Sequence, residues 1–91
     1  MPTVHFLEGE TWEGWRHAVM FHAQTDAQQL IVCLVPSQTL RDRFGAVTTQ
    51  QADLINAFRC NRSQIEEIAR RLIEAGRFET DGSIVIHRAD V

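Results

Sequence analysis

From residue 63 to residue 76, apolar side chains recur every three or four positions, which is the spacing of one face of an α-helix. Ser63 begins this run, Glu66 follows three residues later, and Gly76 stands at its end. Serine followed by glutamate at this distance is typical of a capping box, and glycine commonly ends a helix in the left-handed conformation. The pattern therefore predicts a helix from Ser63 to Gly76. Its inward face would consist of Ile65, Ile68, Ala69, Leu72 and Ile73.

A second helical stripe comes before this one, and Thr48 or Thr49 could cap it. Its spacing continues into the later stripe, so residues 49–75 could form one long kinked helix or two helices. We favour a break near Asn61 to Ser63, because Asn61 would otherwise lie on the apolar stripe and serine suits a cap better than a helix interior. The inward residues of the earlier part would be Leu54, Ile55 and Phe58.

A third, shorter helix is expected directly after Pro36, with Ser37 as its N-cap. Leu40 and Phe44 stand four residues apart, so they would share its inner side. Gly45 follows and predicts the end of this helix.

Four segments carry the alternation or the short apolar run of a β-strand. The first three, residues 4–6, 15–21 and 30–35, have short connections and predict a meander. The third run is apolar at both parities, so we expect a strand that is buried on both faces. It would be central in the sheet, or a partner chain would cover its second face. The pair Asp81-Gly82 predicts a tight turn before the last strand, residues 83–88.

Together these elements predict one α+β domain spanning residues 1–91, since a chain of this length buries a single core. We expect two layers, an antiparallel sheet of about four strands with three helices packed on one face, in the order βββαααβ. The other face of the sheet would meet solvent or a partner. Met20 is a candidate for that face, and an apolar sheet patch there would suit a protein contact, so we predict a homodimer.

Two tryptophans stand close together near the start of the second predicted strand. Trp15 shares the parity of Val19 and Phe21, so we expect it in the core. Trp12 lies in the loop that enters the strand. It could pack in or at the edge of the core, which we favour, or be an anchor for a protein contact.

The block from Asn56 to Arg70, NAFRCNRSQIEEIAR, resembles a signature of the small bacterial family known as domain of unknown function 1488. The likeness extends over nearly all of the chain, with Val4-x-Phe6 at the start and Gly82-x-Ile84-x-Ile86 near the end. The resemblance implies a single-domain α+β fold in the bacterial cytoplasm and no established activity. It carries over no catalytic or ligand-binding residue.

Composition excludes several functions. All 9 basic residues are arginine and the chain has no tyrosine, which excludes a lysine Schiff base, a P-loop lysine and a tyrosine nucleophile. A net charge of −3 argues against general affinity for nucleic acid or an anionic membrane, because both require an excess of positive charge. No signal peptide is visible and no apolar stretch approaches the ~20 residues of a membrane span. We therefore expect a cytoplasmic protein.

The candidate contact surface on the predicted helices consists of Arg59, Arg62, Arg70 and Arg71. Arginine side chains suit phosphate and carboxylate groups. Glutamates are interleaved with these arginines, so we favour a solvated helix face whose charge is neutralised locally. Binding of nucleic acid or another anionic ligand is the alternative.

No pattern indicates a catalytic residue, a metal site or a cofactor. The four histidines lack metal-ligand spacing, and Cys33 and Cys60 stand far apart without a CxxC motif. Cys33 lies in the most apolar run, so we expect a small buried hydrophobe. For Cys60 we favour a helix residue without a role, and a redox-sensitive thiol beside arginine is the alternative. We therefore predict a non-enzymatic interaction or regulatory domain that self-associates or binds another protein, and we expect no binding to nucleic acid or membrane.

Overall fold

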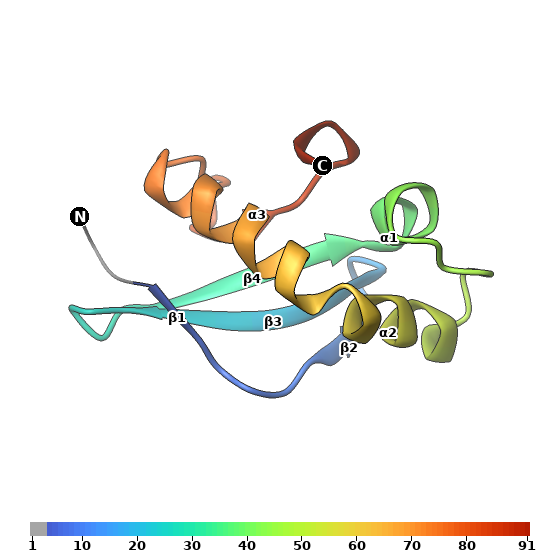
Figure 1. The fold of residues 1–91 in the computed structure, drawn as a ribbon. Coiled ribbons are helices and arrows are strands. Elements are labelled where there is room, and N and C mark those ends of the chain that lie inside the picture. The colour runs from blue at the N-terminus through green and yellow to red at the C-terminus, as the bar shows by residue number, and fades with distance from the viewer. Residues whose placement is uncertain (1–3) are drawn as a thin grey trace.

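The structure of this protein is a computed structural model that describes residues 4–91. In it, five strands form one sheet, and three α-helices cover one face of that sheet (Figure 1). The strands are β1 (Val4–Phe6), β2 (Thr11–Glu13), β3 (Ala18–Thr25), β4 (Leu30–Pro36) and β5 (Ile84–Val85). The helices are α1 (Ser37–Arg43), α2 (Gln51–Cys60) and α3 (Arg62–Glu74), and a 3-10 turn, η1 (Arg88–Asp90), follows β5.

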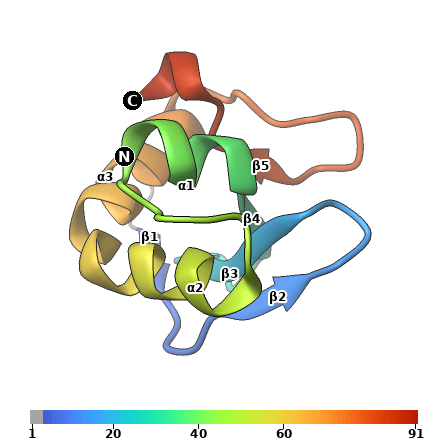
Figure 2. The same cartoon turned by 90° about the vertical axis from the view of Figure 1, so that its right-hand side faces the viewer.

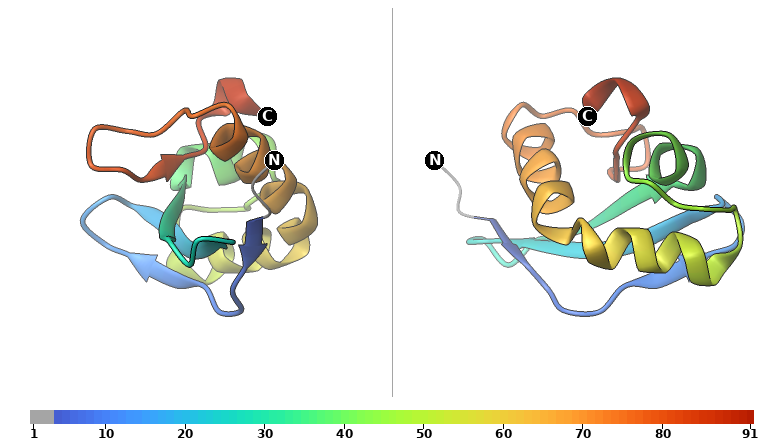
Figure 3. Two further views of the ribbon diagram at one scale, coloured as in Figure 1. Left: turned by 90° about the vertical axis from the view of Figure 1, so that its left-hand side faces the viewer. Right: turned by 45° about the vertical axis from the view of Figure 1, so that its right-hand side comes forward.

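The sheet has the strand order β1-β3-β4-β5. The short strand β2 pairs with the first residues of β3, whereas β1 pairs with its last residues. This arrangement confirms the α+β class, the two layers and the central position of the third apolar run, which is β4. Figure 3 shows the three helices on the same side of the sheet. The order of elements follows the prediction except for β2, which adds a strand before β3.

The expected all-antiparallel sheet is wrong at one edge, because β5 pairs with β4 in parallel. Parallel neighbours need a crossover connection, and the three helices between β4 and β5 provide one. The extra strand has a local cause. Residues 14–17 form a turn in which His17 adopts a positive φ of 47°, so Thr11–Glu13 folds back and pairs with the start of β3.

The core lies between the sheet and the helices. Register pairs Val19 with Val35 and Phe21 with Cys33 on the covered face, and all four side chains are buried. Phe58 from α2 packs on Phe21, with 5.1 Å between the ring centroids. The other buried apolar residues on the helices are Leu40, Leu54, Ala57, Ile65, Ile68, Ala69 and Ile73.

The chain breaks between α2 and α3 at Asn61, as predicted, so residues 51–74 form two helices. The Asn61 amide Nδ2 donates to the carbonyl of Ala57 at 2.9 Å and to that of Phe44 at 3.2 Å. The first bond satisfies a carbonyl near the end of α2, and the second ties the break to the end of α1. Gly76, with a φ of +71°, ends α3 as predicted, where its N–H bonds to Ile73 and the next N–H bonds to Leu72.

The predicted N-caps are wrong. Helix α3 begins at Arg62, so Ser63 lies inside its first turn, and the capping residue Asn61 makes no side-chain cap. Glu66 instead accepts a hydrogen bond from Arg62 at 2.8 Å.

The caps expected for the two earlier helices are displaced in the same way. Pro36 takes the cap position of α1, so Ser37 is its first helical residue. Gln50 takes the cap position of α2, while Thr48 Oγ1 accepts from the Gln50 N–H at 3.0 Å. No helix within residues 4–91 is long and apolar enough to cross a membrane.

Candidate functional site

The face of the sheet that the helices leave uncovered, here called the open face, is apolar along its central strand. Along β4 the side chains with this parity are Leu30, Val32, Leu34 and Pro36. Met20 of β3 stands opposite Leu34 on the same face, as the sequence predicted. A sheet face in contact with water normally carries polar residues at such positions. The open face is therefore the strongest candidate for a binding surface.

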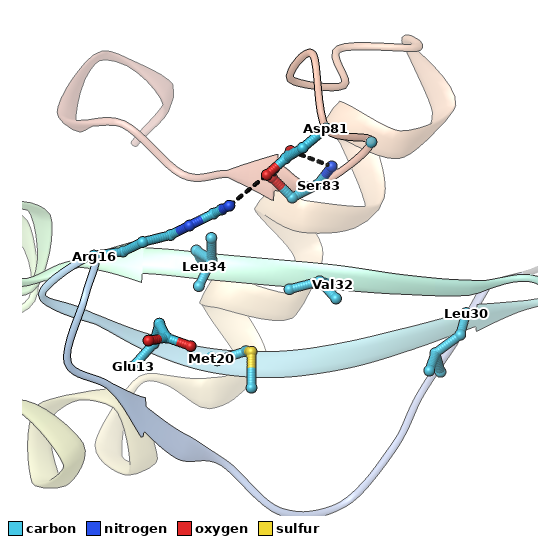
Figure 4. A pocket seen from close by; sticks show the side chains of 9 residues that line it. Glu13, Arg16, Met20, Leu30, Val32, Leu34, Asp81 and Ser83 are labelled. Carbon is cyan, nitrogen blue, oxygen red and sulfur yellow. Dashed lines mark hydrogen bonds and ion pairs between the residues drawn. The ribbon is translucent and has the colours of Figure 1, made fainter.

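Two loops border the open face and leave a hollow between them, here called the open-face hollow. Figure 2 shows the β2–β3 turn and the segment before β5 projecting on the same side of the molecule. The hollow has a volume of about 270 Å³. Figure 4 shows Met20, Val32 and Leu34 along its floor on β3 and β4. The remaining lining residues are Glu13, Arg16, Leu30, Asp81, Gly82 and Ser83.

An ion pair joins the two loops at one end of the open-face hollow, where Arg16 Nη2 donates to Oδ2 of Asp81 (Figure 4). Oδ1 of Asp81 accepts from the Ser83 hydroxyl at 2.6 Å and from the Ser83 N–H at 3.0 Å. The hydrogen bonds from Ser83 and Arg16 hold the pKa of Asp81 well below its ordinary value. Leu34 is only 2% exposed, whereas Leu30 at the other end is 56% exposed, so the hollow is closed at the Arg16 end and open at the Leu30 end.

The structure separates the two tryptophans, both of which were expected to pack in or at the edge of the core. Trp15 is 97% exposed, because it lies in the turn rather than in β3 and the strand alternation does not reach it. Trp12 stands opposite Val19 in β2 and packs against the core on the covered face. The predicted core position of Trp15 is therefore wrong, and the favoured core packing of Trp12 is confirmed.

Three of the four candidate arginines are paired with glutamates. Arg59 donates to Glu10 Oε1, and Arg62 contacts the same carboxylate at 3.8 Å and Glu66 at 2.8 Å. The Glu10 side chain is only 10% exposed, and the hydrogen bond from Arg59 lowers the pKa of Glu10. Arg62 also donates to the Leu7 carbonyl at 2.7 Å, so this cluster fastens the β1–β2 loop to the helices.

Arg70 and Arg71 lie farther along α3. Arg70 contacts Glu67 at 3.5 Å and lies 5.9 Å from the centroid of the Phe6 ring. Arg71 is exposed and has no ion pair within the part of the chain that the structure describes. The four arginines therefore do not form a continuous set of free cations.

The groups considered for chemistry are separated. Cys33 is buried, and burial raises the pKa of its thiol to about 12, as expected of a small hydrophobe. Cys60 is exposed at the end of α2. Across residues 4–91 no three histidine, cysteine or acidic side chains are grouped so that they could hold a metal ion.

Sequence reasoning missed the residues that border the open-face hollow. Arg16 and Asp81 are 65 residues apart, and nothing local in the chain links them. The Asp81-Gly82 turn was visible, and Gly82 does adopt a positive φ of 85°, but a turn signal does not say which loop it will face.

Comparisons with known proteins agree with the resemblance seen in the sequence. The chain is similar to the crystal structure of a protein of unknown function from the DUF1488 family of Shewanella loihica PV-4, with 28% identity and a TM-score of 0.85 over 93% of this chain and 92% of that one. No curated protein matches. The family model described as protein of unknown function (DUF1488) matches residues 4–86. This protein therefore belongs to the DUF1488 family.

Proposed function

We propose that this protein is a small, non-enzymatic cytoplasmic interaction domain that forms a homodimer through the open face of its sheet. One observation carries the proposal. Four successive open-face positions of β4, from Leu30 to Pro36, are all apolar, and β4 is a central strand. Leu34 is buried in the single chain, but Leu30 is exposed and Val32 is half-buried, so part of this apolar strip remains in contact with water. Exposed apolar surface of this kind is typical of a protein contact.

A second copy of the chain suits this face because the face is complementary to itself. In a two-fold contact the same patch meets on both subunits, so the apolar strips pack on each other. The rim of the hollow carries both signs, Glu13 and Asp81 against Arg16. The protein measures 37 × 24 × 24 Å, and the sheet follows its long axis (Figure 1), so the open face runs along the longest dimension of the protein.

The alternative function, binding of nucleic acid or another anion by the helix arginines, has less support. Arg59, Arg62 and Arg70 each have an acidic neighbour, so an incoming phosphate would have to displace a carboxylate. The non-enzymatic proposal draws support from Cys33, whose raised pKa disfavours the nucleophilic thiolate. Two unpaired cysteines suit the reducing cytoplasm.

Sedimentation velocity over a range from micromolar to hundreds of micromolar tests the proposed dimer. We expect the wild type to form a dimer and Val32→Glu to remain a monomer, because the charge would be buried against apolar side chains. Leu30→Glu, at the exposed end of the strip, should act in the same direction. Val47→Glu is the matched control, since Val47 is 81% exposed in the loop between α1 and α2 and does not line the hollow.

Each variant is first checked for folding by circular dichroism and thermal melting. A wild type that stays monomeric at every concentration would contradict the proposal. So would a dimer that Val32→Glu and Leu30→Glu leave as stable as Val47→Glu does.

A further inference from the structure

Trp15 is the largest apolar side chain that the fold leaves in water, at 97% exposed. A tryptophan that becomes buried removes about 150–250 Å² from water, and tryptophans are enriched among the residues that dominate binding energy. Trp15 belongs neither to the hydrophobic core nor to the ion pairs that Arg59 and Arg62 form with Glu10. Its exposure therefore requires a separate explanation.

The backbone at Trp15 is held in place before any partner binds. Its N–H donates to Oε1 of Glu13 at 3.2 Å, and the next residue, Arg16, is tied to Asp81 across the hollow. The turn is closed on its other side by the pairing of β2 with β3. Little conformational freedom of the turn would be lost on binding, which favours affinity.

The open-face hollow has the chemistry that an indole ring requires. Its floor is apolar, with the thioether of Met20 beside Val32 and Leu34, and methionine sulfur packs well against aromatic rings. The carboxylate of Glu13 lines its side, and a buried indole N–H needs one acceptor.

On the basis of the proposed dimer, we infer that Trp15 of each copy inserts into the open-face hollow of the second copy and donates its indole N–H to the rim carboxylate of Glu13. Anchor and receiving hollow belong to the same chain, so one two-fold axis makes the contact twice. The hollow is closed at the Arg16 end and open at the Leu30 end, so the ring enters past Leu30.

Two measurements test this exchange of tryptophans. In sedimentation experiments we expect Trp15→Ala to raise the dimer dissociation constant at least about 30-fold, the effect of losing a hot-spot residue, while Val47→Ala leaves it unchanged. In the Trp12→Phe variant Trp15 is the single tryptophan. Its fluorescence emission should shift to shorter wavelength as rising concentration drives association. Thermal melting checks that Trp12→Phe keeps the fold. If this variant does not fold, the emission of Trp15 is obtained instead by subtracting the spectrum of Trp15→Ala from that of the wild type.

The outcomes separate the anchor from the dimer itself. An unchanged dissociation constant for Trp15→Ala, together with a monomeric Val32→Glu, would overturn the exchange and leave the open-face dimer standing. Dimerisation without any emission shift would have the same meaning. A wild type that is monomeric throughout would overturn both.

Discussion

Replacing Asn61 by alanine tests how the break between α2 and α3 is held. The side-chain amide donates to two carbonyls, at 2.9 Å to Ala57 and at 3.2 Å to Phe44, and so ties the break to the loop after α1. A neutral hydrogen bond contributes about 0.5–1.5 kcal/mol net. Asn61 is half-buried, so water replaces part of what is lost, and we expect Asn61→Ala to lower the free energy of unfolding by about 1–2 kcal/mol.

For a domain of this size, such a loss lowers the melting temperature by about 5–15 °C. Urea unfolding followed by circular dichroism measures the free energy, and calorimetry measures the melting temperature. Asn56→Ala is the matched control, since Asn56 is exposed on α2 and alanine has the higher helix propensity there.

Asn61→Asp distinguishes the hydrogen bonds from the shape of the residue. Aspartate keeps the shape but points a carboxylate oxygen at the two carbonyls, so we expect a larger loss than with alanine. If Asn61→Asp were as stable as the wild type, or if Asn61→Ala lost less than about 0.5 kcal/mol, the hydrogen-bond explanation would be wrong.

Three further predictions concern charge and thiols. Glu10→Gln should lower the free energy of unfolding by about 1 kcal/mol in urea titrations, because the almost buried side chain loses the negative charge that faces the exposed Arg59; no loss would mean that the charge pair contributes nothing. The lowered pKa values of Glu10 and Asp81 mean that the unfolded chain binds more protons, so unfolding midpoints should fall as pH drops below about 5, and constant midpoints down to about pH 3 would contradict this. A thiol reagent at neutral pH should label one cysteine, Cys60, rapidly in the native protein and both in denaturant, whereas fast labelling of Cys33 would refute its burial.

The sequence was sufficient wherever a feature depends on neighbouring residues. Gly76 and Asn61 mark helix boundaries because their backbone and side-chain preferences act locally. The apolar run of β4 indicated a central strand because few exposed strands are apolar at both parities. The family resemblance supported the same fold over most of the chain.

The predictions were wrong where interactions between distant residues, or competing local interactions, determine the structure. The alternation through Trp15 predicted a core residue, yet the turn with His17 at a positive φ interrupts the strand and exposes the ring. The direction of β5 depends on how the crossover returns to β4, which no local pattern encodes. Ser63 would make a good cap, but Arg62 already belongs to α3.

The open-face hollow could not be predicted for the same reason. It exists because a turn near residue 16 and a loop near residue 81 meet over the sheet, and their ion pair spans most of the chain. Met20 was the one lining residue that strand parity placed correctly on the open face.

Native mass spectrometry of the untagged protein, purified without denaturant or chelator, tests the central claim most directly. We predict a species at twice the 10.4 kDa chain mass, with no added mass, and its loss in Val32→Glu. A monomer at every loading concentration would contradict the open-face dimer, and a species that carries a metal, nucleotide or other ligand would contradict the proposal of a pure interaction domain.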